Sequence, residues 1–301
     1  MKSIEVSDIT KTYNGRTVVD RLSFSVDKGE VFGLLGHNGA GKSTTIDCLL
    51  GLTKPDSGSA RILGQNAAKH RKTLFEHVGV QLQHAAHANN IRVCEVCEET
   101  AALYHEPADY HALLKQFQLE AFTNQKVEQL SGGERQKLSV VVALIPNPQV
   151  IFLDELTTGL DVAARREVWH ILKSLKQKGM TIFLTTHYME EAAKAAHIAV
   201  IDHGELLEYG TPYELKDRHA KDKLILTAAK QEHLAKLLQH LQVSYEQNDQ
   251  RYQIELNTTM DALQILPAVQ PYIEGFEVLQ GTMDDVFLHI TGKTPEEEVA
   301  L

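Results

Sequence analysis

Cysteine is scarce in this sequence, and long apolar runs are absent from it. Three cysteines are too few for a disulfide framework. Cys94 and Cys97 form a CxxC pair, but without a second pair this spacing is weak evidence for a metal or redox site, and two small residues at the start of a helix explain it more simply. The longest apolar run, residues 138–145, is far shorter than the ~20 residues that cross a bilayer. Residues 1–8 contain charges and no apolar signal region, so we expect the chain to stay where it is made and to reach a membrane only through a partner.

Basic residues are in the minority. The 30 Lys and Arg residues face 40 Asp and Glu residues, which gives a formal net charge of −10 over 301 residues. Sequence-independent binding of DNA or RNA needs a net basic face, so we expect no nucleic-acid partner. Hydrophobic residues make up 43% of the chain, which is enough for a buried core and excludes wholesale disorder.

The apolar pattern predicts an α/β fold. Short, largely apolar runs, typical of buried parallel strands, occur at residues 31–35, 150–153, 181–184 and 198–202. Helices are predicted at residues 42–50 and 163–178, and strands and helices that alternate in this way indicate a parallel sheet with helices on its faces. Alternating patterns at residues 4–6 and 18–26 add N-terminal strands, which the fold class places as antiparallel strands beside a mixed or parallel core sheet.

A domain boundary is expected where a Gly-Thr-Pro turn leads into a charged stretch at residues 216–223. The predicted domains are residues 1–217, with a helical subdomain at about 88–145, and a small α+β domain at residues 218–301. The small domain follows the order βαββαβ, with its second strand at residues 243–246 and a final helix, and this order suits a ferredoxin-like fold.

A glycine-rich segment that fits G-x-x-x-x-G-K-[ST] follows the first buried strand and precedes a helix. It consists of Gly36, His37, Asn38, Gly39, Ala40, Gly41, Lys42 and Ser43, followed by Thr44. Glycines let the backbone N–H groups fold around phosphates, and the helix N-terminus adds its positive dipole. Lys42 is expected to reach the β- and γ-phosphates and Ser43 to ligate Mg²⁺. A simple glycine turn is the structural alternative.

Two adjacent carboxylates, Asp154 and Glu155, end the second buried strand. Ligands of doubly wound sheets bind at the carboxyl ends of the strands, so both side chains should face the glycine-rich segment. Asp154 is predicted to hold Mg²⁺ through water, and Glu155 to orient and deprotonate the attacking water.

The segment Leu-Ser-Gly-Gly-Glu-Arg-Gln at residues 130–136 is a second candidate anion site ahead of a helix. One nucleotide needs only one such helix start. The second is therefore expected to serve the nucleotide of another copy of the chain.

Residues 2–217 resemble the ATP-binding subunits of ABC transporters. The resemblance is carried by the glycine-rich P-loop, the signature segment 130–136, the strand ending in Asp154 and Glu155, the segment Thr-Gly-Leu-Asp at 158–161, and Thr186-His187, in family order. It implies an ATPase that uses ATP and Mg²⁺ and works as a homodimer or with a paired ABC ATPase subunit.

The resemblance also assigns single residues. Tyr13 matches the aromatic residue that stacks on adenine, although a half-buried strand tyrosine would look the same. Gln83 matches the glutamine that touches Mg²⁺ and relays to the membrane subunit, with Gln81 as an alternative alignment. His187 matches the histidine that contacts the γ-phosphate, and Asp161 lies in the matching dimer-interface loop.

In the signature segment, Ser131 and Gly133, with Gly132 between them, match the donors to the γ-phosphate of the opposite chain. Three residues depart from the family pattern, namely Leu156 in place of proline, His37 in place of proline and Glu134 in place of glutamine. None of these removes a ligand, although Leu156 restores a backbone N–H that proline would lack. An HxxH pair, His84 and His87, is explained by a solvated loop more simply than by a metal site.

The use of the ATPase is indicated by three features. A single cassette disfavours the tandem translation-factor branch, and the absence of sustained heptads excludes the long coiled-coil ATPases. Residues 284–292 look like the closing motif of drug-exporter ATPases, which pair with six-helix permeases of the ABC-2 type, although an ordinary amphipathic helix would also fit. We therefore expect an export ATPase on the cytoplasmic face of the membrane; the alternatives are a soluble regulatory ABC ATPase and a P-loop kinase.

Overall fold

The computed structural model describes residues 1–82 and 90–292 and divides the chain into two compact units, Met1–Pro212 and Tyr213–Leu301. The division falls five residues before the boundary expected after residue 217, which lies inside helix α8 (Pro212–His219). The charged stretch 216–223 is therefore no linker, because it forms the end of α8 and the start of the next strand. Among the described residues, no helix is long and apolar enough to cross a membrane.

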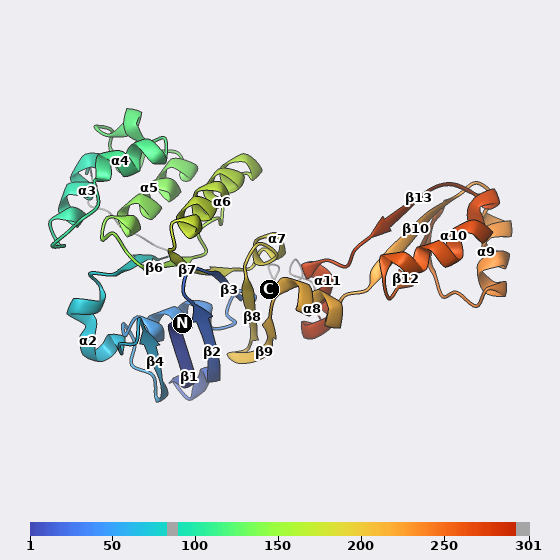
Figure 1. Cartoon of the computed structure of the whole chain (residues 1–301), viewed down its shortest axis with the longest axis horizontal. Helices are drawn as coiled ribbons and strands as arrows, with labels where there is room; N and C mark the ends of the chain where they lie inside the picture. The colour runs from blue at the N-terminus through green and yellow to red at the C-terminus, as the bar shows by residue number, and fades with distance from the viewer. Residues whose placement is uncertain (83–89, 293–301) are drawn as a thin grey trace. The chain divides into compact units, whose positions relative to one another are not determined.

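A six-stranded sheet forms the centre of the first unit (Figure 1). Its spatial order is β5 (Val78–Gln81), β6 (Val150–Asp154), β7 (Thr181–Thr186), β3 (Val31–Leu35), β8 (His197–Asp202) and β9 (Glu205–Gly210). The first five strands are parallel and β9 is antiparallel, so the sheet is mixed. Every residue of β3, β6 and β7 is buried, because a parallel sheet is covered on both faces.

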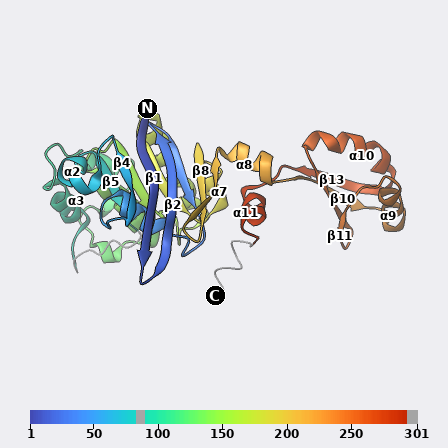
Figure 2. The same cartoon turned by 90° about the horizontal axis from the view of Figure 1, so that it is seen from below.

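A second sheet of the first unit contains only antiparallel strands. Its order is β2 (Arg16–Asp27), β1 (Lys2–Tyr13) and β4 (Ser57–Ile62), and Figure 2 shows the long β1–β2 pair side by side. The rings of Phe24 and Phe32 stack with their centroids 5.1 Å apart, and Phe32 stacks on Phe183 at 5.3 Å. This aromatic core, which Ile46 of helix α1 (Lys42–Leu49) joins, ties the second sheet to the first.

Most helices of the first unit lie between β5 and β7 in the sequence. They are α3 (Val93–Ala101), α4 (Tyr110–Gln116), α5 (Gly132–Leu144) and α6 (Val162–Gln177), with α2 (Ala67–Leu74) before β5, α7 (Met189–Ala192) after β7, and 3-10 turns at Glu120–Phe122 and Val127–Gln129. Figure 1 shows α3, α4 and α5 gathered into one group. Cys97 is buried in α3, where burial raises the pKa of its thiol to about 12, and such a thiol is structural and unreactive.

The second unit combines an antiparallel sheet with helices. The sheet order is β11 (Glu246–Asn248), β12 (Arg251–Leu256), β10 (Asp222–Ala228) and β13 (Ile273–Leu279); the helices are α9 (Gln231–His240), α10 (Ala262–Val269) and α11 (Met283–Thr291), with 3-10 turns at Thr259–Asp261 and Gln270–Tyr272. The chain order βαββαβ with this strand order is that of ferredoxin-like folds. Leucines of α9 and of alternate β10 positions share one core.

The strand expected at residues 243–246 was placed too early. Val243 and Tyr245 pack against the core before the strand begins, and the strand itself, β11, is exposed throughout and pairs with β12 across a tight turn. Val243 and Tyr245 are thus apolar because they pack on the core just before a short edge strand. Elsewhere in this unit, α8 and α11 are in contact, since the rings of His219 and His289 lie 5.4 Å apart.

Candidate active site

The P-loop lies at the carboxyl edge of the parallel sheet, between the end of β3 and the start of α1. The N–H of Gly36 donates to the carbonyl of Thr186 at the end of β7, at 3.4 Å. A Cβ at Gly36 would lie 2.6 Å from the carbonyl oxygen of Ile201, and Gly41 has a φ of +104°. Only glycine fits both positions, so the loop can run close to β8 and turn into α1.

Lys42 is buried at the base of the P-loop, and its ammonium group is held by three oxygen atoms. Its Nζ donates to the carbonyls of Gly36 at 2.9 Å and His37 at 3.0 Å, and it lies 3.2 Å from Oε1 of Glu155. Burial lowers the pKa of Lys42, and the Glu155 carboxylate opposes that shift. The Lys42 ammonium group is thus largely removed from solvent and lies against the P-loop backbone.

Glu155 follows β6, and two side chains approach the same oxygen of its carboxylate. His187 approaches Oε1 with its Nδ1 at 3.7 Å, and Lys42 contacts the same oxygen. His187 together with Lys42 lowers the pKa of Glu155 to about 2 against the opposing effect of burial. Its side chain is 7% exposed, so Glu155 is a largely buried carboxylate at neutral pH.

Asp154 is also buried, and its partner comes from the neighbouring strand β7. The hydroxyl of Thr185 donates to Oδ1 of Asp154 and accepts the N–H of Glu155 at 3.0 Å. One hydroxyl therefore fixes the positions of both carboxylates. Neither the strand pattern nor the motifs pointed to Thr185, whose only sequence signal is its place just before Thr186-His187.

A buried glutamate, Glu191 of α7, connects the loops that follow β6 and β7. It accepts hydrogen bonds from the hydroxyls of Thr157 and Thr186, the latter at 2.7 Å. The N–H of Tyr188 donates to the Thr186 hydroxyl at 2.9 Å, which positions the backbone on both sides of His187. No sequence pattern pointed to Glu191, because nothing in a Glu-Glu pair tells which side chain turns inward.

A small pocket lies over the P-loop, with a volume of about 250 Å³. It is lined by Val18, Asn38, Gly39, Gly41, Lys42, Ser43, Thr44 and Glu155. The structure thus brings most of the expected P-loop residues and the expected base to one place. Tyr13 does not line this pocket: it ends β1, is 43% exposed, and has the Lys11 ammonium 5.1 Å from its ring centroid.

The signature residues lie at the start of α5. Ser131 is the N-cap, and its hydroxyl accepts the N–H of Glu134, whose carboxylate in turn accepts the N–H of Ser131 at 2.7 Å. Glu134, the departure from glutamine, therefore completes a capping box. A Cβ on Gly133 would lie 3.7 Å from Ala164 of α6, so the signature segment lies beside the start of that helix.

Asp161 caps α6 by accepting the N–H of Ala164 at 2.8 Å. The expected site residues consequently form two groups, one around Lys42 and Glu155 and one around Ser131 and Asp161. Residues of the second group do not line the P-loop pocket.

Gln83 lies outside the described residues, as do His84 and His87. The alternative glutamine, Gln81, is buried at the end of β5, where its amide donates to the carbonyls of Leu82 at 2.8 Å and Asp154 at 3.4 Å. It therefore contacts the backbone of the Asp154 position.

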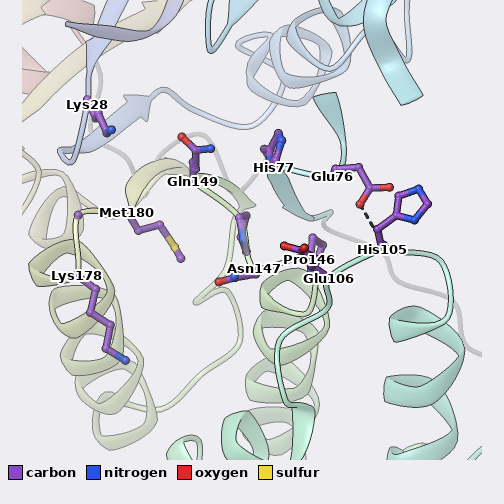
Figure 3. A pocket seen from close by; sticks show the side chains of 12 residues that line it. Lys28, Glu76, His77, His105, Glu106, Pro146, Asn147, Gln149, Lys178 and Met180 are labelled. Atoms are coloured by element: carbon purple, nitrogen blue, oxygen red, sulfur yellow. Dashed lines mark hydrogen bonds between the residues drawn. The ribbon is translucent and has the colours of Figure 1, made fainter. Parts of the chain in front are cut away.

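A larger hollow of about 870 Å³ lies at the opposite edge of the sheet (Figure 3). His77, Gln149 and Met180 line it, and each directly precedes a parallel strand. Parallel α/β sheets bind ligands at the carboxyl ends of their strands, so this hollow is on the wrong edge for the chemistry of Asp154 and Glu155.

Comparison with family models gives two matches. Residues 19–158 match the model described as ABC transporter. Residues 210–291 match the model described as ATP-binding protein DrrA1-3-like, C-terminal domain.

Similar proteins include the daunorubicin/doxorubicin resistance ATP-binding protein DrrA of Streptomyces peucetius, which is 33% identical over 98% of this chain and 94% of its own length. The Nod factor export ATP-binding protein I of Rhizobium etli is 39% identical over 72% of this chain and 71% of its own. Among solved structures, an ATP-binding subunit of an ABC transporter is similar with a TM-score of 0.65 at 28% identity, covering 71% of this chain and 91% of that one. A dimeric bacterial ABC transporter cassette, MJ0796, has a TM-score of 0.63 at 25% identity, covering 69% of this chain and 98% of that one.

Proposed function

The chain belongs to the ABC transporter family of ATP-binding proteins, and from this we propose that it binds and hydrolyses ATP to drive export through a separate membrane permease. The observation that carries the proposal is the convergence of Lys42, Ser43 and Glu155 on one pocket at the carboxyl edge of the sheet. The S. peucetius relative, which matches nearly the whole chain, is a drug-resistance ATP-binding protein, and the R. etli relative is a Nod factor export ATP-binding protein.

In this mechanism the P-loop backbone and Lys42 bind the β- and γ-phosphates of ATP. The two side chains that lower the pKa of Glu155, His187 and Lys42, are the ones expected to contact phosphate. When they turn toward phosphate, the Glu155 carboxylate regains basicity and can accept a proton from the attacking water. His187 then stabilises the charge on the γ-phosphate.

Oxygen donors suited to Mg²⁺ are present at the same edge. Ser43 lines the pocket, and Asp154 presents a carboxylate fixed by Thr185, which are the ligand types that Mg²⁺ prefers. We propose that these two residues, with Gln83, hold the ion, which when bound neutralises phosphate charge.

We propose further that two copies enclose two nucleotides. The P-loop pocket of about 250 Å³ is smaller than the ~300–1,000 Å³ of pockets that hold a whole small molecule. The group around Ser131 and Gly133 lies at the start of α5 and lines no part of that pocket. A second copy would bring its signature segment, together with its Asp161 loop, to the γ-phosphate of the first.

Tyr13 is proposed to stack on adenine from its exposed position at the end of β1. The proposed domains are the ATPase domain, residues 1–217, and an accessory domain, residues 218–301. The proposed partner is a six-helix permease of the ABC-2 type, which would hold the chain on the cytoplasmic face of the membrane.

The test is a mild-detergent pull-down of tagged Glu155→Gln from native membranes, with mass spectrometry of the bound proteins. Glu155→Gln is expected to stay in the ATP-bound dimer and to retain a stoichiometric polytopic membrane protein. Glu190→Gln, an exposed neighbour of the site on α7, is the matched control and should hydrolyse ATP at the parent rate. Repeated capture of soluble proteins alone, from fully solubilised membranes, would replace the export proposal with that of a regulatory ATPase.

A further inference from the structure

Three metal-ligating side chains meet beside the P-loop and have no part in the proposed ATPase chemistry. His37 is a P-loop residue, Asp202 ends β8, and His203 begins the turn between β8 and β9. Their ligand atoms, one from each side chain, all lie within 4.8 Å of one another. The side chains of His37 and Asp202 are 13% and 18% exposed, while that of His203 is 64% exposed. The group is therefore half-buried and open to solvent on one side.

The imidazole of His37 lies between two acceptors. Its Nδ1 is 2.6 Å from the carbonyl oxygen of Asn38, and its Nε2 contacts Oδ1 of Asp202. A neutral imidazole carries one N–H and one lone pair. With Nδ1 directed to Asn38, Nε2 and the Asp202 carboxylate oxygen lie side by side as two possible ligand atoms for one cation.

His203 supplies a third possible ligand atom for a metal ion. Its Nε2 lies 3.8 Å from the same Asp202 oxygen, and its ring meets that of His37 edge to face at 5.5 Å. Ligands about 2.0–2.2 Å from a tetrahedral Zn²⁺ are separated by roughly 3.5 Å, so the three atoms need only small movements to share one ion. A carbonyl placed to accept the other ring N–H of a ligating histidine, as that of Asn38 is, is the usual support of such a site.

The backbone fixes the third ligand in place. His203 has a φ of +47° and Gly204 of +84°, which is the conformation of a tight two-residue hairpin turn. The N–H of Gly204 donates to the carbonyl of Ala40 in the P-loop at 3.0 Å. A side chain at residue 204 would collide with the carbonyl of Val18, since its Cβ would lie 2.3 Å away. The turn is thus attached to the P-loop at a fixed distance from His37.

We propose that His37, Asp202 and His203 form a binding site for a divalent transition metal ion of the Zn²⁺ type, with its fourth position open to solvent. Two imidazoles and one carboxylate suit Zn²⁺ and its neighbours in the transition series, whereas Mg²⁺ prefers oxygen ligands alone. The site is therefore chemically distinct from the proposed magnesium site. A bound ion would join residue 37 of the P-loop to the β8–β9 turn and stabilise the nucleotide pocket.

The test uses the full chain without nucleotide and measures Zn²⁺ binding by titration calorimetry. His203→Asn removes one ligand, and asparagine tolerates the positive φ of this position. The parent chain is expected to bind one more equivalent of Zn²⁺ than His203→Asn, or to bind that equivalent at least tenfold more tightly. His240→Asn, an exposed histidine at the end of α9, is the matched control and should bind as the parent does. Equal Zn²⁺ binding by the parent and His203→Asn would overturn the proposal.

A second measurement does not depend on the variant folding. Co²⁺ replaces Zn²⁺ and gives an intense visible spectrum when four-coordinate. The parent chain is expected to show this spectrum at one equivalent of Co²⁺, to lose it on addition of Zn²⁺, and to melt at a higher temperature with Zn²⁺ than without it. A spectrum of octahedral Co²⁺ only, with no change in melting temperature, would contradict the proposal.

Discussion

Lys42 and Glu155 form a buried ion pair, with Nζ 3.2 Å from Oε1 and side chains only 4% and 7% exposed. The pair joins the P-loop to the end of β6, so the group expected to bind phosphate and the group expected to activate water are in direct contact. Breaking one side of a buried pair leaves an uncompensated charge. A change to either Lys42 or Glu155 should therefore alter the electrostatic environment of the other.

The first prediction concerns acid stability. The folded-state pKa of Glu155, about 2, is below its ordinary 4.5, so its contribution to stability is present above pH 4.5 and is lost as the pH falls toward 2. At a pH of about 3.5, one unit below the ordinary pKa, the loss should be about 1 kcal/mol. Urea unfolding at about pH 7 and about pH 3.5 should show a larger fall for the parent chain than for Glu155→Gln. Equal falls would mean that the pair does not hold the carboxylate ionised.

The second prediction concerns Thr185. Thr185→Val removes the hydroxyl that donates to Asp154 and accepts the N–H of Glu155. Loss of a hydrogen bond to a buried carboxylate should lower the free energy of unfolding by about 1.5–3 kcal/mol. The Mg²⁺ concentration that half-activates ATP hydrolysis should rise about tenfold or more, as for other losses of support to a metal ligand. Thr185→Ser should restore both values, and a Thr185→Val chain with the parent's Mg²⁺ dependence would refute the assignment.

Glu191 carries the third prediction. In Glu191→Gln one of the two carboxylate oxygens becomes an amide nitrogen, which cannot accept the hydroxyls of Thr157 and Thr186 as Glu191 does. We expect the free energy of unfolding to fall by about 1–3 kcal/mol. We also expect kcat to fall with little change in KM for ATP, because the network positions His187 and does not touch the nucleotide. Glu190→Gln, on the exposed side of α7, should change neither, and a KM effect equal to the kcat effect would contradict a positioning role.

The fourth prediction separates the two roles of Ser131. Ser131→Ala removes an N-cap and should cost about 1 kcal/mol of stability. Thr282 caps α11 with the same capping-box geometry, so Thr282→Ala should cost about as much. Only Ser131→Ala should lower ATP hydrolysis, because only Ser131 is expected at the γ-phosphate of a partner chain. Equal ATPase rates for the two variants would reduce Ser131 to a helix cap.

The sequence predicted the parts of the fold that depend on continuous local patterns. The buried strands ending in Leu35, Asp154 and Thr186 each contain a continuous apolar run, and the structure has a strand at all three predicted places, with the P-loop directly after the first. The α/β class and the parallel part of the sheet follow from the same pattern, whereas the antiparallel strand β9, which makes the sheet mixed, was not predicted.

What the sequence left out are contacts between distant segments. Thr185 and Glu191 act through hydroxyls and carboxylates whose partners lie on other elements, and no local periodicity reports such pairs. The edge strand β11 was misplaced for a related reason, since Val243 and Tyr245 are apolar for packing and not for strand pairing. His37 and Asp202 are 165 positions apart in the sequence and in contact in the fold. The sequence therefore indicated a role only for the backbone of His37, and the fold adds a side-chain partner.

The central claim is that Glu155 activates the water that attacks ATP held between two copies of this chain. The most direct measurement is sedimentation velocity of purified Glu155→Gln with ATP and Mg²⁺, together with phosphate release by the same sample. The account predicts an ATP-dependent dimer that persists and releases no phosphate above background, while the parent chain turns over. Phosphate release at the parent rate, or a chain that binds ATP and stays monomeric, would contradict it.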